Sequence, residues 1–180
     1  MLRFDDRVWL LWAAWILLLP LNWLAAAATA AAFHEICHGA AVILLGGKIR
    51  RITVAPFGAV IEAEGIEGFR SLLSSLAGPL GSFGLAMAIH RFPLLGLCAL
   101  VQGGFNLLPV YPLDGGRALT QLLESILPKQ APMVATWVER TVLFLLLAAT
   151  VTVCLRYSLG LFPISFCVFA IILTLLRKRP

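Results

Sequence analysis

The sequence predicts an all-α polytopic membrane protein with about six transmembrane helices and one short β-rich segment. The 180 residues are 61% hydrophobic and only 13% charged, with a mean hydropathy of +0.95. Soluble domains have about 45–50% apolar and about 25% charged residues. A soluble chain of this size exposes about a third of its surface, so it cannot bury such an excess. The composition excludes a soluble enzyme, a disordered chain and a nucleic-acid-binding protein.

Apolar runs mark the expected spans, since a transmembrane helix needs about 20 apolar residues. The segment 48–67 differs from them: it is rich in β-branched residues and contains a Pro-Phe-Gly turn, which favours a hairpin or small sheet. A short helix is expected over 117–127. The six predicted spans are 8–21, 24–45, 69–89, 93–110, 134–155 and 159–176.

Basic residues indicate the orientation in the membrane. With six spans both termini lie on one side, which receives all of the 14 Lys and Arg residues except Arg91 and Arg156. Because basic residues accumulate on the cytoplasmic side, both termini are expected to be cytoplasmic.

The second expected span contains His34-Glu35-Ile36-Cys37-His38. Residues four apart lie on one face of a helix, so both imidazoles project the same way and can hold a zinc ion. Zinc would acidify a water molecule, and Glu35 would take its proton and deliver it to the leaving amine. A chance motif and a polar packing contact are the alternatives. Three titratable residues inside lipid are costly, however, and such residues are normally functional.

A zinc site needs a third protein ligand, and Asp114 is the best candidate. It follows Pro109 and Pro112 and precedes Gly115-Gly116, and irregular backbone at membrane depth is tolerated only where it is buried or lines a water-filled cavity. An ordinary turn residue is the alternative for Asp114 taken alone. His90, at the far end of the third span, is expected at the membrane interface rather than at the metal.

Two motifs in order, His34-Glu35-x-x-His38 and Asn106-x-x-Pro109-x-x-x-x-Asp114-Gly115, resemble those of the site-2 protease family of intramembrane zinc metalloproteases. The resemblance covers nearly the whole chain, and the layout of the spans is most similar to the sporulation-type branch of the family.

The resemblance implies one Zn²⁺ ion per chain, bound by the two histidines and Asp114, with Glu35 as the catalytic base. It implies that Asn106 and Pro109 position the substrate or the transition state. Ala77-Gly78-Pro79 matches a family element with a packing role. Relatives carry a PDZ domain or a C-terminal regulatory domain, neither of which is visible here, so a single catalytic core over residues 1–180 is expected.

The implied function is hydrolysis of a peptide bond in or near a transmembrane segment of a membrane-bound protein, as in regulated intramembrane proteolysis. The expected partners are a transmembrane protein substrate, the lipid bilayer and a membrane regulatory protein, with no nucleic acid. The expected location is the bacterial cytoplasmic membrane.

Three alternatives stay open at this point. A metal-ion transporter or channel could use the same His, Glu and Asp side chains, although ligands along a pathway must release the ion that a catalytic site retains. A catalytically idle relative is a further possibility, but it need not keep all four residues. The 48–67 segment either receives an extended substrate by strand addition or only caps the interface.

Overall fold

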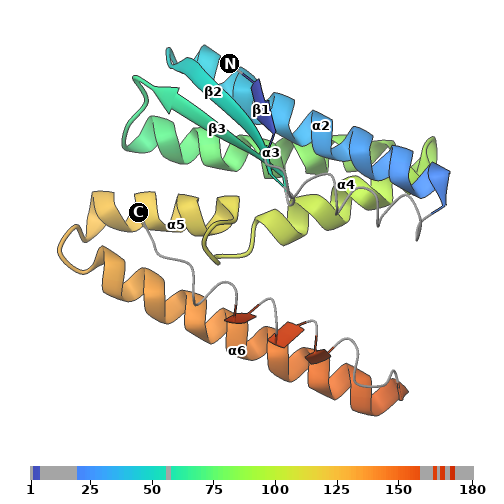
Figure 1. Cartoon of the computed structure of the whole chain (residues 1–180). Coiled ribbons are helices and arrows are strands. Elements are labelled where there is room, and N and C mark those ends of the chain that lie inside the picture. Colours follow the sequence, from blue (N-terminus) through green and yellow to red (C-terminus); the bar gives the residue numbers. More distant parts are fainter. Residues whose placement is uncertain are drawn as a thin grey trace. The chain divides into compact units, whose positions relative to one another are not determined.

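The computed structural model describes residues 2–4, 20–55, 58–158, 164–165, 167–168 and 171–172 (Figure 1). The chain divides into two compact units, residues 1–107 and residues 108–180. The described elements are, in chain order, β1 (Leu2–Phe4), α2 (Leu21–Leu44), β2 (Lys48–Ala55), β3 (Gly58–Glu64), α3 (Phe69–Ala86), the 3-10 helix η1 (Met87–His90), α4 (Pro93–Asn106), α5 (Asp114–Ile126) and α6 (Ala131–Tyr157).

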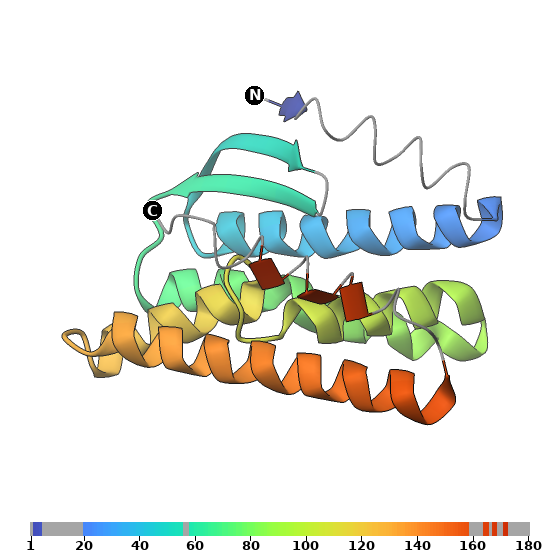
Figure 2. The same cartoon turned by 60° about the horizontal axis from the view of Figure 1, so that its bottom comes forward.

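In the first unit, each of the helices α2, α3 and α4 packs against the other two (Figure 2). Small residues fill the interfaces: Ala30 of α2 and Ala99 of α4 are at most 1% exposed, and Ser82 of α3 is fully buried. Because lipid is as apolar as a leucine side chain, membrane helices associate through close packing, and small residues permit the closest approach. This packing brings polar groups of α3 against α2.

The predicted hairpin is present and belongs to a three-stranded sheet. β2 and β3 pair antiparallel, and β1 adds in parallel to the other side of β2. A register irregularity at Arg50 accompanies two cross-strand ion pairs from adjacent residues, Arg50 with Glu64 and Arg51 with Glu62. The hairpin contacts α2 and lies alongside the C-terminal part of that helix in Figure 2. The parallel partner of β2 was not predicted.

In the second unit, α5 and α6 pack against each other. The buried side of α6 carries Ala131, Ala135 and Glu139, and Ala118 is buried on α5. The helix expected over 117–127 is therefore present, but it begins three residues earlier, at Asp114.

Three helices among the described residues are long and apolar enough to cross a membrane: Leu21–Leu44, Phe69–His90 and Ala131–Tyr157. They correspond to the second, third and fifth predicted spans. The prediction of six helical spans is not confirmed. The first predicted span lies outside the described residues except for its end at 20–21, and most of the sixth, 159–176, lies outside them as well.

The fourth predicted span, 93–110, is too long. The structure has a helix of 14 residues that ends at Asn106, because the loop containing Pro109 and Pro112 follows. At 1.5 Å per residue such a helix is about 21 Å long, which is less than the about 30 Å of hydrocarbon in a bilayer.

Gly96 is predicted to be essential for the contact between α4 and η1. A Cβ atom at Gly96 would lie 2.5 Å from the Cα atom of Ile89, so Gly96→Ala should destabilise the chain by about 1–3 kcal/mol, as overpacking does. Gly104, also on α4, is the matched control, because a Cβ atom there meets nothing within 4 Å. Gly104→Ala should leave stability unchanged or raise it by up to about 1 kcal/mol. Thermal unfolding of the full chain in detergent measures both; equal stability of the two variants would contradict the packing.

Candidate metal centre

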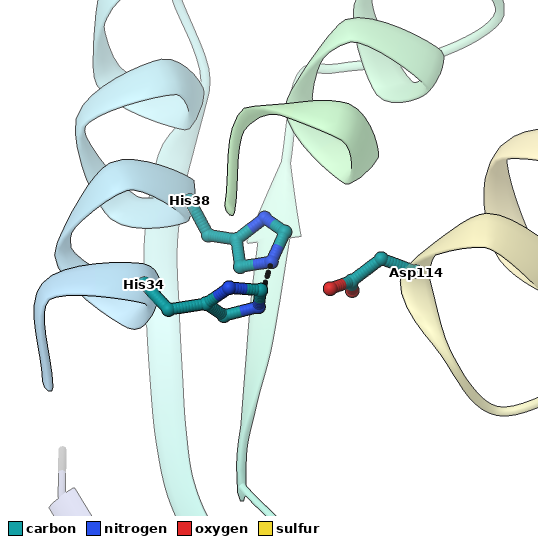
Figure 3. Close-up of side chains that lie close together, drawn as sticks. All are labelled: His34, His38 and Asp114. Carbon is teal, nitrogen blue, oxygen red and sulfur yellow. Dashed lines mark hydrogen bonds between the residues drawn. The ribbon is translucent and has the colours of Figure 1, made fainter. Parts of the chain in front are cut away.

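His34 and His38 face each other from successive turns of α2. Their Nε2 atoms lie 3.2 Å apart (Figure 3), and the two ring planes are nearly perpendicular, at 80°. His34 is buried, with 2% of its surface exposed, and His38 is half-buried. The predicted common face of the two imidazoles is therefore present within the first unit.

Residues of α3 contact the Nδ1 atoms of both rings. The Nδ1 atom of His38 lies 2.7 Å from the carbonyl oxygen of Ser74, and the Nδ1 atom of His34 lies 2.9 Å from Oγ of Ser82. Histidines that bind metals typically engage their second ring nitrogen in this way, which sets the orientation of the ring. Residue 34 meets residue 82 and residue 38 meets residue 74, so the two helices run antiparallel here.

The arrangement of the two imidazoles fits a zinc ion. Zinc–nitrogen distances of 2.0–2.1 Å and tetrahedral angles place two such ligands about 3.3 Å apart, and the observed separation is 3.2 Å. A carbonyl oxygen can only accept a hydrogen bond, so Nδ1 of His38 donates to Ser74, and Nε2 is the nitrogen on the side of His34. A neutral imidazole that engages one ring nitrogen in this way can bind a metal ion through the other.

Gly78 keeps the space beside the two imidazoles open. A Cβ atom at this position would lie 2.7 Å from Nε2 of His34 and still closer to Nε2 of His38. These are the two nitrogens that would bind the metal, so any larger side chain would compete with the ion for the same place. The packing role that the family resemblance implied for Ala77-Gly78-Pro79 is thus more specific: the glycine lets α3 approach the face of α2 that carries both imidazoles.

Sequence reasoning did not identify Ser74 and Ser82 of α3 as partners of the imidazoles, and it gave Gly78 only a packing role. Ser74, Gly78 and Ser82 recur every four residues, and all three are buried. Such a row of small and polar residues in an otherwise apolar span could have indicated a helix face turned towards polar groups.

The first unit also contains Glu35, Asn106 and His90, which the sequence analysis singled out. Glu35 follows His34 on α2 and is half-buried. Asn106 is the last residue of α4, and its Nδ2 atom donates a hydrogen bond to the carbonyl oxygen of Gln102 at 3.1 Å. His90 is exposed at the end of η1, at the far end of the helix pair from Ser74.

In the second unit, Pro109 lies half-buried in the loop before α5, and Asp114 is the first residue of that helix, with 8% of its surface exposed. The loop folds back tightly on the helix start, since a Cβ atom at Gly116 would lie 2.5 Å from the carbonyl carbon of Val110. A helix N-terminus favours a negative charge, so this position suits a carboxylate that serves as an anionic ligand. Figure 3 draws this side chain together with the two histidines.

Comparisons with known proteins agree with this chemistry. The sequence profile of peptidase family M50 matches residues 72–149. The matched range contains Gly78, Ser82 and Asp114 but begins after His38, so the His-Glu-x-x-His motif is an observation separate from the profile match.

Two curated relatives are similar to parts of the chain. One is a zinc metalloprotease of Methanocaldococcus jannaschii, 36% identical over 104 residues, which cover 50% of this chain and 31% of the relative. The other is the stage IV sporulation protein FB of Bacillus subtilis, 34% identical over 112 residues, which cover 54% of this chain and 38% of the relative. The chain thus spans about a third of the length of the curated relatives it matches.

A solved structure shares the fold. The site-2 protease from Methanocaldococcus jannaschii matches with a TM-score of 0.69 and 23% sequence identity, over 99% of this chain and 91% of that one. This structure shows the fold, while the profile match and the two relatives confirm the resemblance to the site-2 protease family that the two sequence motifs indicated.

Gly78→Ala is predicted to abolish metal binding while the helix persists. The added methyl group would occupy the space beside both Nε2 atoms, whereas alanine is the better helix former. Gly84 is the matched control on the same helix, since a Cβ atom there meets nothing within 4 Å. Zinc content of the purified chain should fall from about one ion per chain to near zero in Gly78→Ala only. Equal zinc content in both variants would show that the ion does not lie beside Gly78.

Proposed function

We propose that the chain is an intramembrane zinc metalloprotease that hydrolyses a peptide bond in or near a transmembrane segment of a membrane protein. The observation that carries this proposal is the pair of Nε2 atoms 3.2 Å apart on α2, a helix long and apolar enough to cross a membrane. Titratable groups inside a bilayer are costly, which makes a functional role the natural explanation. Relatives named as zinc metalloproteases support the same chemistry.

Asp114 is proposed as the third zinc ligand. With His34 and His38 it offers the atom types that zinc prefers, two imidazole nitrogens and one carboxylate oxygen. Three protein ligands are the number found at catalytic zinc sites, where the fourth position stays open to water or substrate.

Glu35 is proposed as the catalytic base. When bound, zinc supplies Lewis-acid chemistry: it withdraws electron density from the scissile carbonyl and from the attacking water. A carboxylate oxygen of Glu35 takes the proton that the water loses and then gives it to the leaving nitrogen, so that the product departs as an amine. Glu35 directly follows a metal ligand on the helix, which keeps the two chemical roles within one turn of α2.

Asn106 and Pro109 are proposed to position the substrate. Asn106 ends α4, and its amide oxygen can accept a hydrogen bond while Nδ2 is held by Gln102. Pro109 belongs to the loop between α4 and α5, where a backbone without regular hydrogen bonds can pair with an extended substrate.

The apolar helices and the relatives support a membrane setting, and the distribution of Lys and Arg residues supports the proposed orientation. The partners would be a transmembrane protein substrate, the surrounding lipid bilayer and a membrane regulatory protein. The location would be the bacterial cytoplasmic membrane, with both termini in the cytoplasm. Nothing among the described residues favours the ion transporter that the sequence also allowed, and one of the two curated relatives is named as a zinc metalloprotease.

Zinc binding tests the ligand set. Asp114→Ala should lower zinc affinity by at least about 100-fold, because one of three protein ligands is lost, and His38→Ala should do the same. Glu124→Ala is the matched control, because it removes an exposed carboxylate from the same helix, α5. Competition with a chelator measures all three variants in detergent. An Asp114→Ala affinity equal to that of Glu124→Ala would remove Asp114 from the site.

Peptide hydrolysis tests the role of Glu35. Glu35→Gln keeps the size of the side chain but cannot accept the proton, so cleavage should fall by about 100-fold to 10,000-fold while zinc affinity stays near wild type. Cleavage of a co-expressed single-span membrane protein, followed by the mobility of its fragments on a gel, measures the activity. Glu124→Gln should cleave like the wild type. Graded loss of metal transport without any cleavage by the wild type would instead favour the transporter.

A further inference from the structure

Helix α6 is longer than the hydrocarbon core of a bilayer. It has 27 residues, which at 1.5 Å per residue make it about 40 Å long, whereas the hydrocarbon is about 30 Å thick. Between Arg140 and Arg156 the stretch 141–155 contains no charged residue. The hydroxyls of Thr150 and Thr152 in this stretch donate hydrogen bonds to carbonyls of their own helix. Polar groups inside lipid need such partners within the protein, so this stretch suits the hydrocarbon.

The surplus length of α6 lies at its N-terminal end, because Arg156 is next to the last residue of the helix. The uncharged stretch is about 23 Å long, and an arginine slightly inside the hydrocarbon can extend its side chain to the headgroups. The edge of the hydrocarbon then falls close to Trp137, which is 64% exposed, and tryptophan is enriched at this level of a membrane. The first turns of α6 and the connection 127–130 therefore extend into the headgroup layer, together with the end of α5 that packs beside them.

This end of the α5–α6 hairpin carries exposed cations. Arg117, Lys129 and Arg140 are all exposed, and none of the three takes part in an ion pair with another described residue. Arg117 and Arg140 each lie nine residues from the connection, on the two legs of the hairpin in Figure 1. Glu124 is the one exposed acidic residue between 114 and 157. The exposed charge at this end of the hairpin is therefore predominantly positive.

Each leg of the hairpin also presents two large apolar side chains spaced four residues apart, which places each pair on one helix face. The pairs are Leu122 with Ile126 on α5 and Met133 with Trp137 on α6, and all four side chains are more than 40% exposed. Exposed apolar side chains next to Lys and Arg are the combination found in helices that bind at the surface of a membrane.

We propose that this surface of the hairpin binds anionic phospholipids. Arg117, Lys129 and Arg140 contact the phosphate groups, and the exposed apolar side chains lie beside the upper parts of the acyl chains. Charge complementarity selects this occupant, since each Lys or Arg near the surface is attracted to a lipid with net negative charge and gains no such attraction from a zwitterionic one. The inference rests on the membrane setting of the proposed function, not on its chemistry.

The lipid contacts would also fix the depth of α5 in the membrane. This helix begins at Asp114, the proposed third zinc ligand, and Arg117 lies one turn further along it. A phosphate group bound at Arg117 therefore anchors the end of α5 that carries the carboxylate.

Lipid binding by the full chain in detergent tests the inference. Native mass spectrometry follows titrations with phosphatidylglycerol, which is anionic, and with phosphatidylcholine of the same acyl chains, which is zwitterionic. The wild type should bind phosphatidylglycerol at least about 10-fold more tightly, because three cations contribute. Arg117→Gln, Lys129→Gln and Arg140→Gln should each lower this preference by up to about 5-fold, and the triple variant should lose it.

Arg156→Gln is the matched control, because it removes an exposed cation from the other end of α6, and it should keep the preference of the wild type. Thermal unfolding close to that of the wild type checks that the triple variant is folded. A wild type without the preference, or a triple variant that retains it, would overturn the inference and favour a protein as the occupant of this surface. An equal loss in Arg156→Gln would overturn it as well, since any surface cation would then suffice.

The position of the hydrocarbon edge has a test of its own. Leu127 and Phe144 are both exposed in the structure, but only Phe144 lies in the uncharged stretch of α6. In vesicles a water-soluble maleimide should label Leu127→Cys well above the background of the native cysteines and should leave Phe144→Cys at that background. Equal labelling of the two variants would overturn the placement of the hairpin end in the headgroup layer.

The inference and the proposed function can fail separately. A wild type that binds zinc and cleaves a membrane protein, but shows no preference for phosphatidylglycerol, would overturn only the lipid-binding surface. A wild type with that preference, but without zinc or cleavage, would overturn only the proposed function.

Discussion

The close approach of α2 and α3 is the constraint on which the rest of the site depends. Gly78 has no side chain, so the backbone of α3 can lie directly beside the imidazoles of His34 and His38. This approach brings the carbonyl of Ser74 and the hydroxyl of Ser82 within hydrogen-bond distance of the rings. In a bilayer such polar contacts have to come from the protein, because the lipid offers neither donors nor acceptors.

Local sequence patterns predicted the features that depend on a single element. The four-residue spacing of His34 and His38 places both rings on one helix face. The periodicity of the helix is enough to predict this, without any knowledge of how the helices pack. The β-branched residues of 48–67 likewise predicted the hairpin. The pairing of Leu2 with Ile52 was missed, because a contact between residues 50 positions apart leaves no trace in either local pattern.

The remaining differences have physical causes that hydropathy does not capture. Leu107, Leu108 and Val110 continue the apolar run of α4, yet the helix ends at Asn106, since the backbone near proline cannot keep its helical hydrogen bonds. Ser82 resembles an ordinary small residue of a membrane helix. Its contact with His34 becomes visible only once the antiparallel register of α2 and α3 is known.

The contact between His38 and the backbone carbonyl of Ser74 affects which positions of α3 can change their side chain. Every residue type provides a backbone carbonyl, so position 74 can change its side chain without loss of that anchor, provided that the new group fits the interface. Position 78 lacks this freedom, because any side chain there would meet the two imidazoles. The contact that orients the His38 ring therefore leaves no signal in a comparison of side chains, although it is present in the fold.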